Sequence, residues 1–252
     1  MKKNFFKVLL FSISASFLST NTTIAQMNDA LVDAAVNNPA RKESNSSRDA
    51  ARMPDQVIKF MGVGAGDTVL DMVSNGGYYT EILAGVVGNN GRVISHMFAN
   101  AGMDSDNEYA KYIRDSAHMS NVVPIYASFN DLDLKENSLD YVFLIQNFHD
   151  FYFDRFDVDV DRILAMYRKT LKPGGIMAII DHQAIEGSPS TIGATVHRID
   201  PIIVKRDMEK AGFILEGGLD ILLNDTDDKS KSVFDPEVGG KTSRFILKFK
   251  NP

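Results

Sequence analysis

Short apolar runs alternate with segments of helical periodicity along most of this 252-residue chain, and this alternation constrains the fold more than any other feature. The runs at 68–72, 139–145 and 176–181 are rich in β-branched or bulky apolar residues. Strands of this kind are buried on both faces, as in a parallel sheet that helices cover on each side. The pattern therefore predicts an α/β fold with a doubly wound, mostly parallel sheet.

The same reading predicts seven strands, at 68–72, 92–98, 122–127, 139–145, 176–181, 213–223 and 244–249. Helices are expected at 28–36, 79–87, 108–118, 155–171 and 201–211, and a short one after Pro54. Residues 37–48 look loop-like. Residues 224–243 are polar and acidic and join two strands without a helix between them, so we expect the sheet to finish with an antiparallel last strand.

The first 25 residues have the pattern of a secretory signal peptide. Three lysines at positions 2, 3 and 7 precede an apolar run from Val8 to Leu18, and the small-residue end Thr23-Ile24-Ala25 follows. The run is shorter than the roughly 20 residues that span a bilayer. Cleavage after Ala25 and a periplasmic or secreted location are predicted, with no membrane attachment afterwards; the alternative is an uncleaved anchor.

The remaining chain divides into an N-terminal helical and polar arm at 26–53 and one α/β domain at 54–252. Loss of the first 25 residues removes three lysines and no acid, so the net charge falls from −6 to −9. An acidic chain without a basic run argues against a nucleic-acid partner, which needs cations to meet phosphates. The absence of cysteine excludes disulfides, thiolate metal sites and a cysteine nucleophile.

A glycine turn follows the first strand, in the segment from Asp71 to Glu81. In a parallel sheet, ligands bind outside the carboxyl ends of the strands, and a helix that starts there offers free N–H groups. The turn lacks both the dinucleotide fingerprint and a P-loop lysine, which argues against nicotinamide and nucleoside-triphosphate enzymes. The alternative is a tight turn without a ligand.

Together, several segments resemble the class I S-adenosylmethionine (SAM)-dependent methyltransferases, and more narrowly a group of exported, predicted methyltransferases of bacteria. The general likeness lies in Val69-Leu70-Asp71 before the turn and in Leu171-Lys172-Pro173-Gly174-Gly175. The narrower likeness covers nearly the whole mature chain and lies in Arg48-Asp49, Arg52, Pro54, Gly76–Ala84, Asn147–Asp150, Asp181-His182, His197–Asp200, Gly240–Thr242 and Arg244-Phe245.

The resemblance implies the Rossmann-like methyltransferase fold, SAM as cofactor and a small-molecule acceptor. It places the cofactor against Asp71, Asn75, Gly76, Gly77, Tyr78 and Asn147, with Asn130 or Asp131 at the adenine. Two features depart from the general pattern. Val73 and Asn75 occupy two of the three usual glycine positions, although asparagine tolerates positive φ. At the end of the second strand, Ser95, His96 and Met97 stand where an acid usually holds the ribose.

Histidines beside carboxylates follow the fourth and fifth predicted strands. His149 adjoins Asp150, His182 adjoins Asp181, and His197 comes further along the chain. A neutral imidazole next to a carboxylate suits a general base, which methyl transfer to a hydroxyl or amine requires. We therefore predict His149, Asp181, His182 and His197 as catalytic residues, and we expect His149, Asp181 and His182 to lie within one cleft. In the alternative interpretation, these side chains hold loops in place.

Three functions remain open from the sequence. The first is an exported SAM-dependent enzyme that methylates a small molecule on oxygen or nitrogen. The second is a methyltransferase-fold protein that has lost methyl transfer and binds another ligand. The third is a metal-assisted hydrolase or lyase that uses the histidine cluster; no short ligand motif such as H-E-x-x-H is present, so no metal is predicted.

Overall fold

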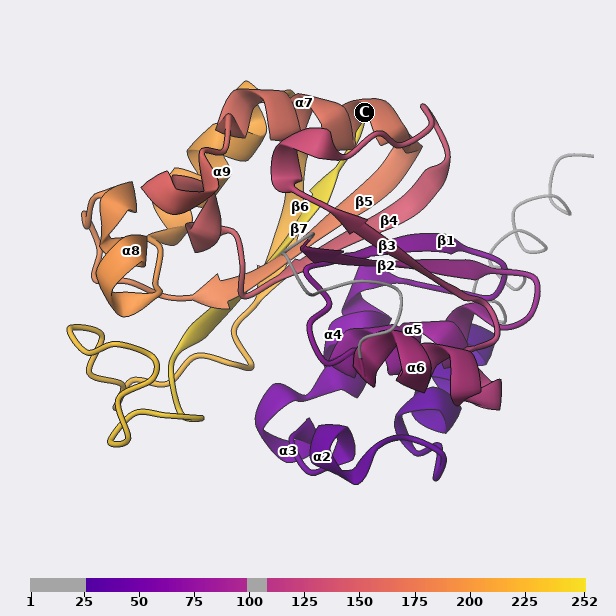
Figure 1. Ribbon diagram of the computed structural model, residues 1–252. Coiled ribbons are helices and arrows are strands. Elements are labelled where there is room, and N and C mark those ends of the chain that lie inside the picture. Colours follow the sequence, from indigo (N-terminus) through magenta and orange to yellow (C-terminus); the bar gives the residue numbers. More distant parts are fainter. Residues whose placement is uncertain (1–25, 99–107) are drawn as a thin grey trace, which may run out of the picture.

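The computed structural model describes residues 26–98 and 108–252 (Figure 1). The predicted signal peptide and its cleavage site lie outside the described residues, except that Gln26 begins a helix at 26–36. Within the described ranges, no helix combines the length and the apolar character needed to cross a bilayer.

A seven-stranded sheet forms the centre of the molecule, with the strand order β3-β2-β1-β4-β5-β7-β6. The strands are β1 (Thr68–Met72), β2 (Arg92–Phe98), β3 (Val122–Ala127), β4 (Leu139–Ile145), β5 (Leu171–His182), β6 (Ile214–Leu219) and β7 (Arg244–Lys250). The first five are parallel, and β7 lies antiparallel between β5 and β6. The predicted fold class is confirmed, including the antiparallel last strand.

Helices cover both faces of this sheet, which explains why its central strands are apolar on both sides. One face carries α4 (Pro54–Met61), α5 (Tyr78–Val87) and α6 (Glu108–Asp115), and the other carries α7 (Val160–Thr170) and α9 (Pro201–Lys210) (Figure 1). Each layer has its own buried cluster, with Ile82 and Phe143 in the first and Leu164 and Leu144 in the second. The two clusters sandwich β4, whose successive side chains enter opposite layers.

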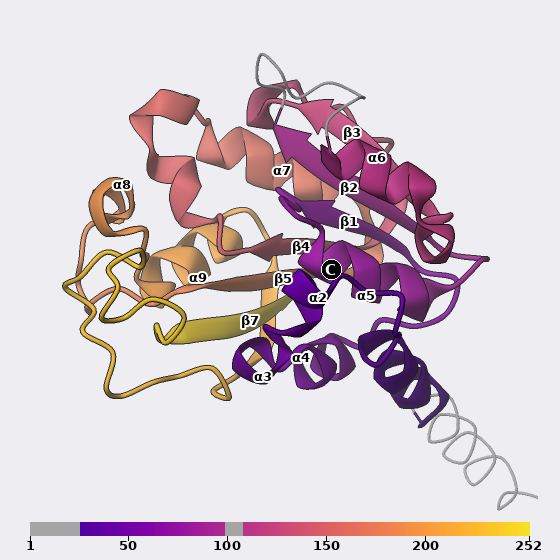
Figure 2. The same cartoon turned by 60° about the horizontal axis from the view of Figure 1, so that its bottom comes forward.

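Several short elements complete the described chain. They are α2 (Glu43–Ser46), α3 (Asp49–Arg52), η1 (Ala117–Met119), η2 (Phe129–Asp131), η3 (His149–Tyr152), η4 (Asp154–Phe156), η5 (Ser190–Ile192) and α8 (Gly193–Val196). In Figure 2, α3 lies beside β7, although nearly the whole domain separates them in sequence. A hydrogen bond from Arg244 Nη2 to the carbonyl of Ala51 (2.6 Å) fixes this contact.

Several element boundaries differ from the sequence prediction; for example, β5 begins at Leu171 and not at 176. The helix expected at 155–171 begins only at Val160, where the Asp159 carboxylate accepts the N–H of Arg162 (3.0 Å). Before it, Phe156 belongs to a separate 3₁₀ turn and stacks on Phe98 at 5.2 Å. The segment at 37–48, expected to be a loop, contains α2, and the strand expected at 213–223 ends at Leu219.

The segment at 220–243 has little regular structure, but a buried ion pair anchors it. Arg198 binds Asp227 through two hydrogen bonds of 2.7 and 2.9 Å, and both side chains are fully buried. The same guanidinium donates to the carbonyls of Gln183 and Lys231. The segment is therefore held against the end of β5, at the same edge of the sheet as the candidate site.

Candidate functional site

A cavity of about 310 Å³ lies at the carboxyl ends of β1, β4 and β5, where parallel sheets bind their ligands. Its volume is within the range of small-molecule sites, about 300–1,000 Å³. We call it the main cavity. Its polar and aromatic lining consists of Arg48, Arg52, Asp71, Ser74, Asn75, Gly76, Tyr78, Tyr79, Gln146, Asn147, His149, Asp150, Arg155, His182, His197 and Phe234.

The turn after β1 forms one wall of this cavity. Val73, Asn75 and Gly77 all have positive φ angles, of 51°, 50° and 77°. The two non-glycine residues therefore keep the left-handed conformation that glycine adopts most easily. Gly76 has no protein atom within 4 Å of the position that a Cβ would occupy, so a ligand can approach its backbone closely.

Gly77 faces protein rather than the main cavity. A Cβ at this position would lie 2.5 Å from the ring of Tyr109, in a backbone conformation that side chains rarely adopt. The Tyr109 hydroxyl is hydrogen-bonded to Ser95 and to Thr80, both at 3.0 Å. A side chain at position 77 would thus clash with α6, and Gly77 does not line the main cavity; the predicted cofactor contact at this residue stays a prediction.

His96, one of the residues in place of the usual acid, secures the turn. Its Nδ1 accepts the N–H of Val73 at 3.3 Å, and its Nε2 donates to the carbonyl of Ala127 at 3.1 Å. Burial lowers the pKa of His96 to about 4, so the ring is neutral at physiological pH. His96 therefore connects β1, β2 and β3 at their carboxyl ends, a role that the sequence did not reveal.

Asp71 lies at the floor of the main cavity and is 3% exposed. Its Oδ2 accepts a hydrogen bond of 2.6 Å from the Thr80 hydroxyl. Burial raises the pKa of Asp71 to about 7, against the weaker opposing effect of Thr80. The carboxyl group therefore changes its charge near neutral pH and not near pH 4.

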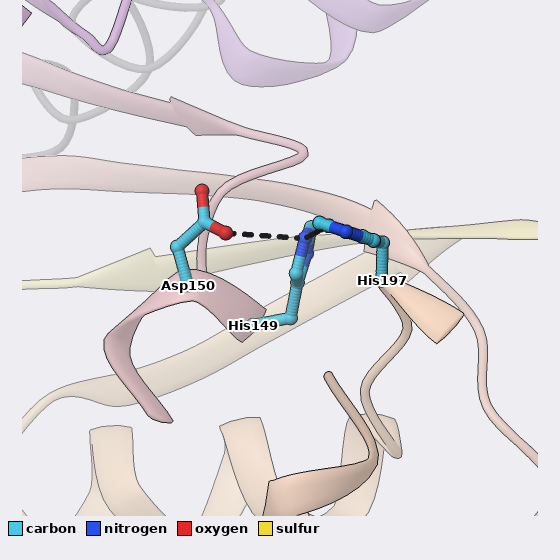
Figure 3. A group of neighbouring side chains, drawn as sticks. All are labelled: His149, Asp150 and His197. Atoms are coloured by element: carbon cyan, nitrogen blue, oxygen red, sulfur yellow. Dashed lines mark hydrogen bonds and ion pairs between the residues drawn. The ribbon is translucent and has the colours of Figure 1, made fainter. Parts of the chain in front are cut away.

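His149 is the centre of a cluster of polar side chains, and Figure 3 shows it between Asp150 and His197. Its Nδ1 lies 2.9 Å from Asp181 Oδ1, and its Nε2 lies 3.3 Å from His197 Nδ1 and 3.4 Å from Asp150 Oδ1. Burial opposes protonation of His149, but the charge and hydrogen bond of Asp181 outweigh it and raise the pKa of His149. Conversely, burial favours neutral Asp181, but the pairing holds the pKa of Asp181 below its usual value.

His182 lines the same cavity but belongs to a different network. Its Nδ1 lies 2.8 Å from the Thr242 hydroxyl. Burial lowers the pKa of His182 to about 3, against the opposing charge of Asp181, so the imidazole stays neutral at working pH. A Thr242 hydroxyl that donates to Nδ1 leaves the Nε2–H of His182 free to donate to a ligand.

The structure thus brings together most of the residues that the sequence singled out. Asp71, Asn75, Gly76, Tyr78, Asn147, His149, His182 and His197 line the main cavity, and Asp181 supports it from below. Two expected adenine contacts do not line it. Asn130 donates to the carbonyl of Asp157 (2.7 Å), and Asp131 accepts from Ser128 (2.6 Å).

Sequence reasoning left several cavity residues without a role, among them Arg48, Arg52, Gln146 and Arg155. The guanidinium carbons of Arg48 and Arg52 lie 4.9 and 4.6 Å from the ring centre of Tyr78. Both arginines belong to the segments that carry the narrower family resemblance, and this was the one indication in the sequence that they could lie at the site. Nothing in the sequence shows that the N-terminal arm reaches the carboxyl ends of the strands.

A family model described as a methyltransferase domain matches residues 62–179. Solved structures share the fold at low identity. A SAM-dependent methyltransferase of Aquifex aeolicus is 21% identical, with a TM-score of 0.59 over 84% of this chain and 100% of its own. A SAM-dependent methyltransferase of Mesorhizobium loti is 15% identical, with a TM-score of 0.55 over 81% of this chain and 99% of its own.

A geranyl diphosphate C-methyltransferase of Streptomyces coelicolor is also similar. Its structure holds Mg²⁺, geranyl diphosphate and S-adenosylhomocysteine, and it is 16% identical, with a TM-score of 0.57 over 87% of this chain and 88% of its own. The comparison with curated proteins found no match. Residues 62–179 therefore match a methyltransferase domain, and the fold is that of the class I SAM-dependent methyltransferases, a family whose methyl donor is SAM.

Proposed function

We propose that this chain, which carries a class I SAM-dependent methyltransferase domain, methylates a small-molecule acceptor on oxygen or nitrogen. The main cavity supports an acceptor of this size, because its volume of about 310 Å³ suits a small molecule. The fold is shared with an enzyme whose structure holds geranyl diphosphate, a small molecule. The acidic charge of the chain argues against a nucleic-acid acceptor.

The residues at the turn fit the methionine end of SAM. The open face at Gly76 leaves room for a ligand against the backbone, and Asn75 and Asp71 border the same space. Arg48 and Arg52 add positive charge to the cavity lining beside Tyr78. The carboxyl group at Asp71 and the ring of Tyr79 are suited to a positively charged ligand atom.

The ribose end of SAM has a different environment from the usual one. Met97 is buried and Phe98 packs on Phe129 with ring centres 4.6 Å apart, so the end of β2 offers aromatic contacts and no carboxylate among the described residues. The acid that usually binds the ribose at the end of the second strand is therefore not replaced by another acid on β2. The residues that contact the cofactor therefore come from the turn and from the carboxyl ends of β1 and β4.

The observation that carries the catalytic part of the proposal is the His149–Asp181 pair at the cavity wall. SAM supplies a methyl group on a sulfonium, which an acceptor lone pair can attack. An acceptor hydroxyl or amine must give up a proton, and His149 Nε2 is the atom that receives it. Asp181 orients the ring through Nδ1, and His197 and Asp150 lie within 3.4 Å of Nε2 to pass the proton on.

We also propose that the enzyme acts outside the cytoplasm after cleavage behind Ala25. The support is the basic start, the short apolar run and the small residues at 23–25. The mass of the protein recovered from a periplasmic fraction tests this part. A mass that retains the first 25 residues contradicts it.

Calorimetry and a methyl-transfer assay test the activity. Purified mature chain is titrated with SAM and S-adenosylhomocysteine, and radiolabelled SAM is then incubated with pools of hydroxyl- and amine-bearing small molecules. Binding of both nucleosides and label transfer that depends on His149 are expected. Binding without transfer to any acceptor indicates a ligand-binding protein, and absence of binding contradicts the cofactor assignment for this chain.

A further inference from the structure

A second, smaller cavity adjoins the main one on the side of β5 and β7. It has a volume of about 210 Å³ and shares Arg48, Arg52, Gln146 and His182 with the main cavity. We call it the arginine pocket, and its polar lining is completed by Thr242 and Arg244. None of the residues of the turn at 73–77 contributes to it.

Three guanidinium groups border this pocket without a carboxylate to balance them. Among the described residues, no carboxylate lies within 4.0 Å of the guanidinium nitrogens of Arg48, Arg52 or Arg244, and none lines the pocket. The nearby acids are committed elsewhere: Asp49 binds Arg41 at 2.7 Å, and Asp181 binds His149. The pocket therefore carries uncompensated positive charge.

Arg244 is the most deeply placed of the three. It is 9% exposed, and its Nε is buried without a hydrogen-bond partner. Its Nη2 donates to the carbonyl of Ala51 (2.6 Å), which holds the side chain in place. Burial lowers the pKa of Arg244, and the charge of Arg52 lowers it further. A buried cation that lacks a partner is costly, so this arrangement is expected where a ligand supplies the missing anion.

The other lining groups are also hydrogen-bond donors. Arg52 stacks on Tyr78 and reaches Gln146 Oε1 only at 3.4 Å, so most of its N–H groups have no acceptor in the described chain. Neutral His182 can add its Nε2–H, since its Nδ1 pairs with Thr242. A planar fork of donors from arginine matches the oxygens of a carboxylate or a phosphate.

We propose that the arginine pocket binds the anionic group, a carboxylate or a phosphate, of the methyl acceptor. This inference rests on the proposed function and names the class of its substrate: a small anionic molecule. The turn that fits the methionine end of SAM does not line this pocket, and Thr242 and Arg244 line it without bordering the main cavity, so we assign the anion to the acceptor. His182 and Gln146 border both cavities, and His149 stands on the main-cavity side. A substrate whose anionic group is bound in the arginine pocket thus extends towards His149, which takes up its proton.

Titrations with inorganic phosphate and with acetate at constant ionic strength test the pocket in the mature chain. Binding of at least one of the two anions to the unchanged protein is expected, with a rise in melting temperature. Arg244→Gln and Arg52→Gln should each weaken it at least tenfold, and Arg244→Lys should retain part of it. Arg114→Gln, which changes an exposed arginine beside Asp115, is the matched control and should leave anion binding unchanged. The absence of binding by both anions overturns the proposal.

The same variants distinguish the acceptor from the carboxylate of SAM. If the acceptor supplies the anion, Arg244→Gln leaves the affinity for SAM and S-adenosylhomocysteine within about twofold of the unchanged protein. A parallel loss of SAM affinity, with competition between SAM and the bound anion, assigns the pocket to the cofactor and overturns the proposal. Because Arg244 also holds the arm through Ala51, circular dichroism must show that the variant is folded. Failure of the protein to bind SAM at all contradicts the proposed function instead, since anion binding by the pocket is measured without SAM.

Discussion

Asp181 holds His149 at two points: its Oδ1 lies 2.9 Å from the imidazole Nδ1, and its Oδ2 accepts the backbone N–H of His149 at 2.9 Å. The two residues are 32 positions apart in sequence and come from the ends of neighbouring parallel strands. This pair fixes both the ring orientation and the start of η3. With Nδ1 held by Asp181, Nε2 lies beside His197 and Asp150 in the lining of the main cavity, which makes His149 the central residue of the proposed mechanism.

The first prediction concerns this pair. His149→Gln and Asp181→Asn should each lower turnover by about 10²-fold or more, the usual scale for loss of a general base or of its orientation. The affinity for SAM should change little, because His149 acts on the acceptor. Single-turnover methyl transfer and calorimetry measure the two quantities. Asn130→Ala, outside the cavity, serves as the control, and equal turnover in all four proteins contradicts the assignment.

The second prediction compares two adjacent glycines. Gly76→Val should reduce SAM affinity at least tenfold with little change in stability, because its Cβ meets no protein atom within 4 Å and faces the main cavity. Gly77→Val should instead lower the melting temperature, since its Cβ would lie 2.5 Å from Tyr109 at a φ of 77°. Thermal melts and calorimetry on both variants test the contrast. If Gly77→Val lowers SAM affinity and Gly76→Val lowers only the melting temperature, the ligand lies at Gly77 instead.

The third prediction is a pH dependence that arises from Asp71. Its pKa is raised from 3.8 to about 7 in the folded state, so the folded chain keeps a proton that the unfolded chain loses between these values. Stability from this group therefore falls as the pH rises from 3.8 to 7, by about 4 kcal/mol in total at 1.36 kcal/mol per unit. Asp71→Asn removes the effect. Denaturant unfolding at pH 4, 5.5 and 7 should show that the free energy of unfolding of the variant rises relative to that of the unchanged protein. If the two free energies change with pH in parallel, the prediction is refuted.

The fourth prediction concerns metals. Ligand atoms of His149, Asp150 and His197 lie within 4.8 Å of one another, so one zinc ion could contact all three. Because His149 Nε2 is assigned as the proton acceptor, Zn²⁺ should inhibit methyl transfer and a chelator should restore it. His197→Gln should weaken this inhibition. Activity that is abolished by the chelator and restored by Zn²⁺ would instead indicate a metal-assisted reaction.

Most of the sheet could be predicted from the sequence, because strand identity depends on local composition. β1, β2, β3 and β4 have the predicted bounds, since each is an apolar run with polar or glycine residues at its ends. The helix before β5 was predicted too long. Phe156 continues the apolar spacing of α7, but it packs with Phe98, an aromatic residue 58 positions earlier, and periodicity alone cannot distinguish these two environments.

The sequence by itself determined the fold class, the turn after β1 and the set of histidines and aspartates at strand ends, because in a parallel sheet chain order decides which residues reach the carboxyl edge. Only the tertiary structure decided which of these residues touch. It directed Gly77 to Tyr109, Asn130 to Asp157, and His182 to Thr242. It also brought the arginines of the N-terminal arm beside Arg244 of the last strand. That contact depends on packing between segments almost 200 residues apart, for which the local sequence carries no signal.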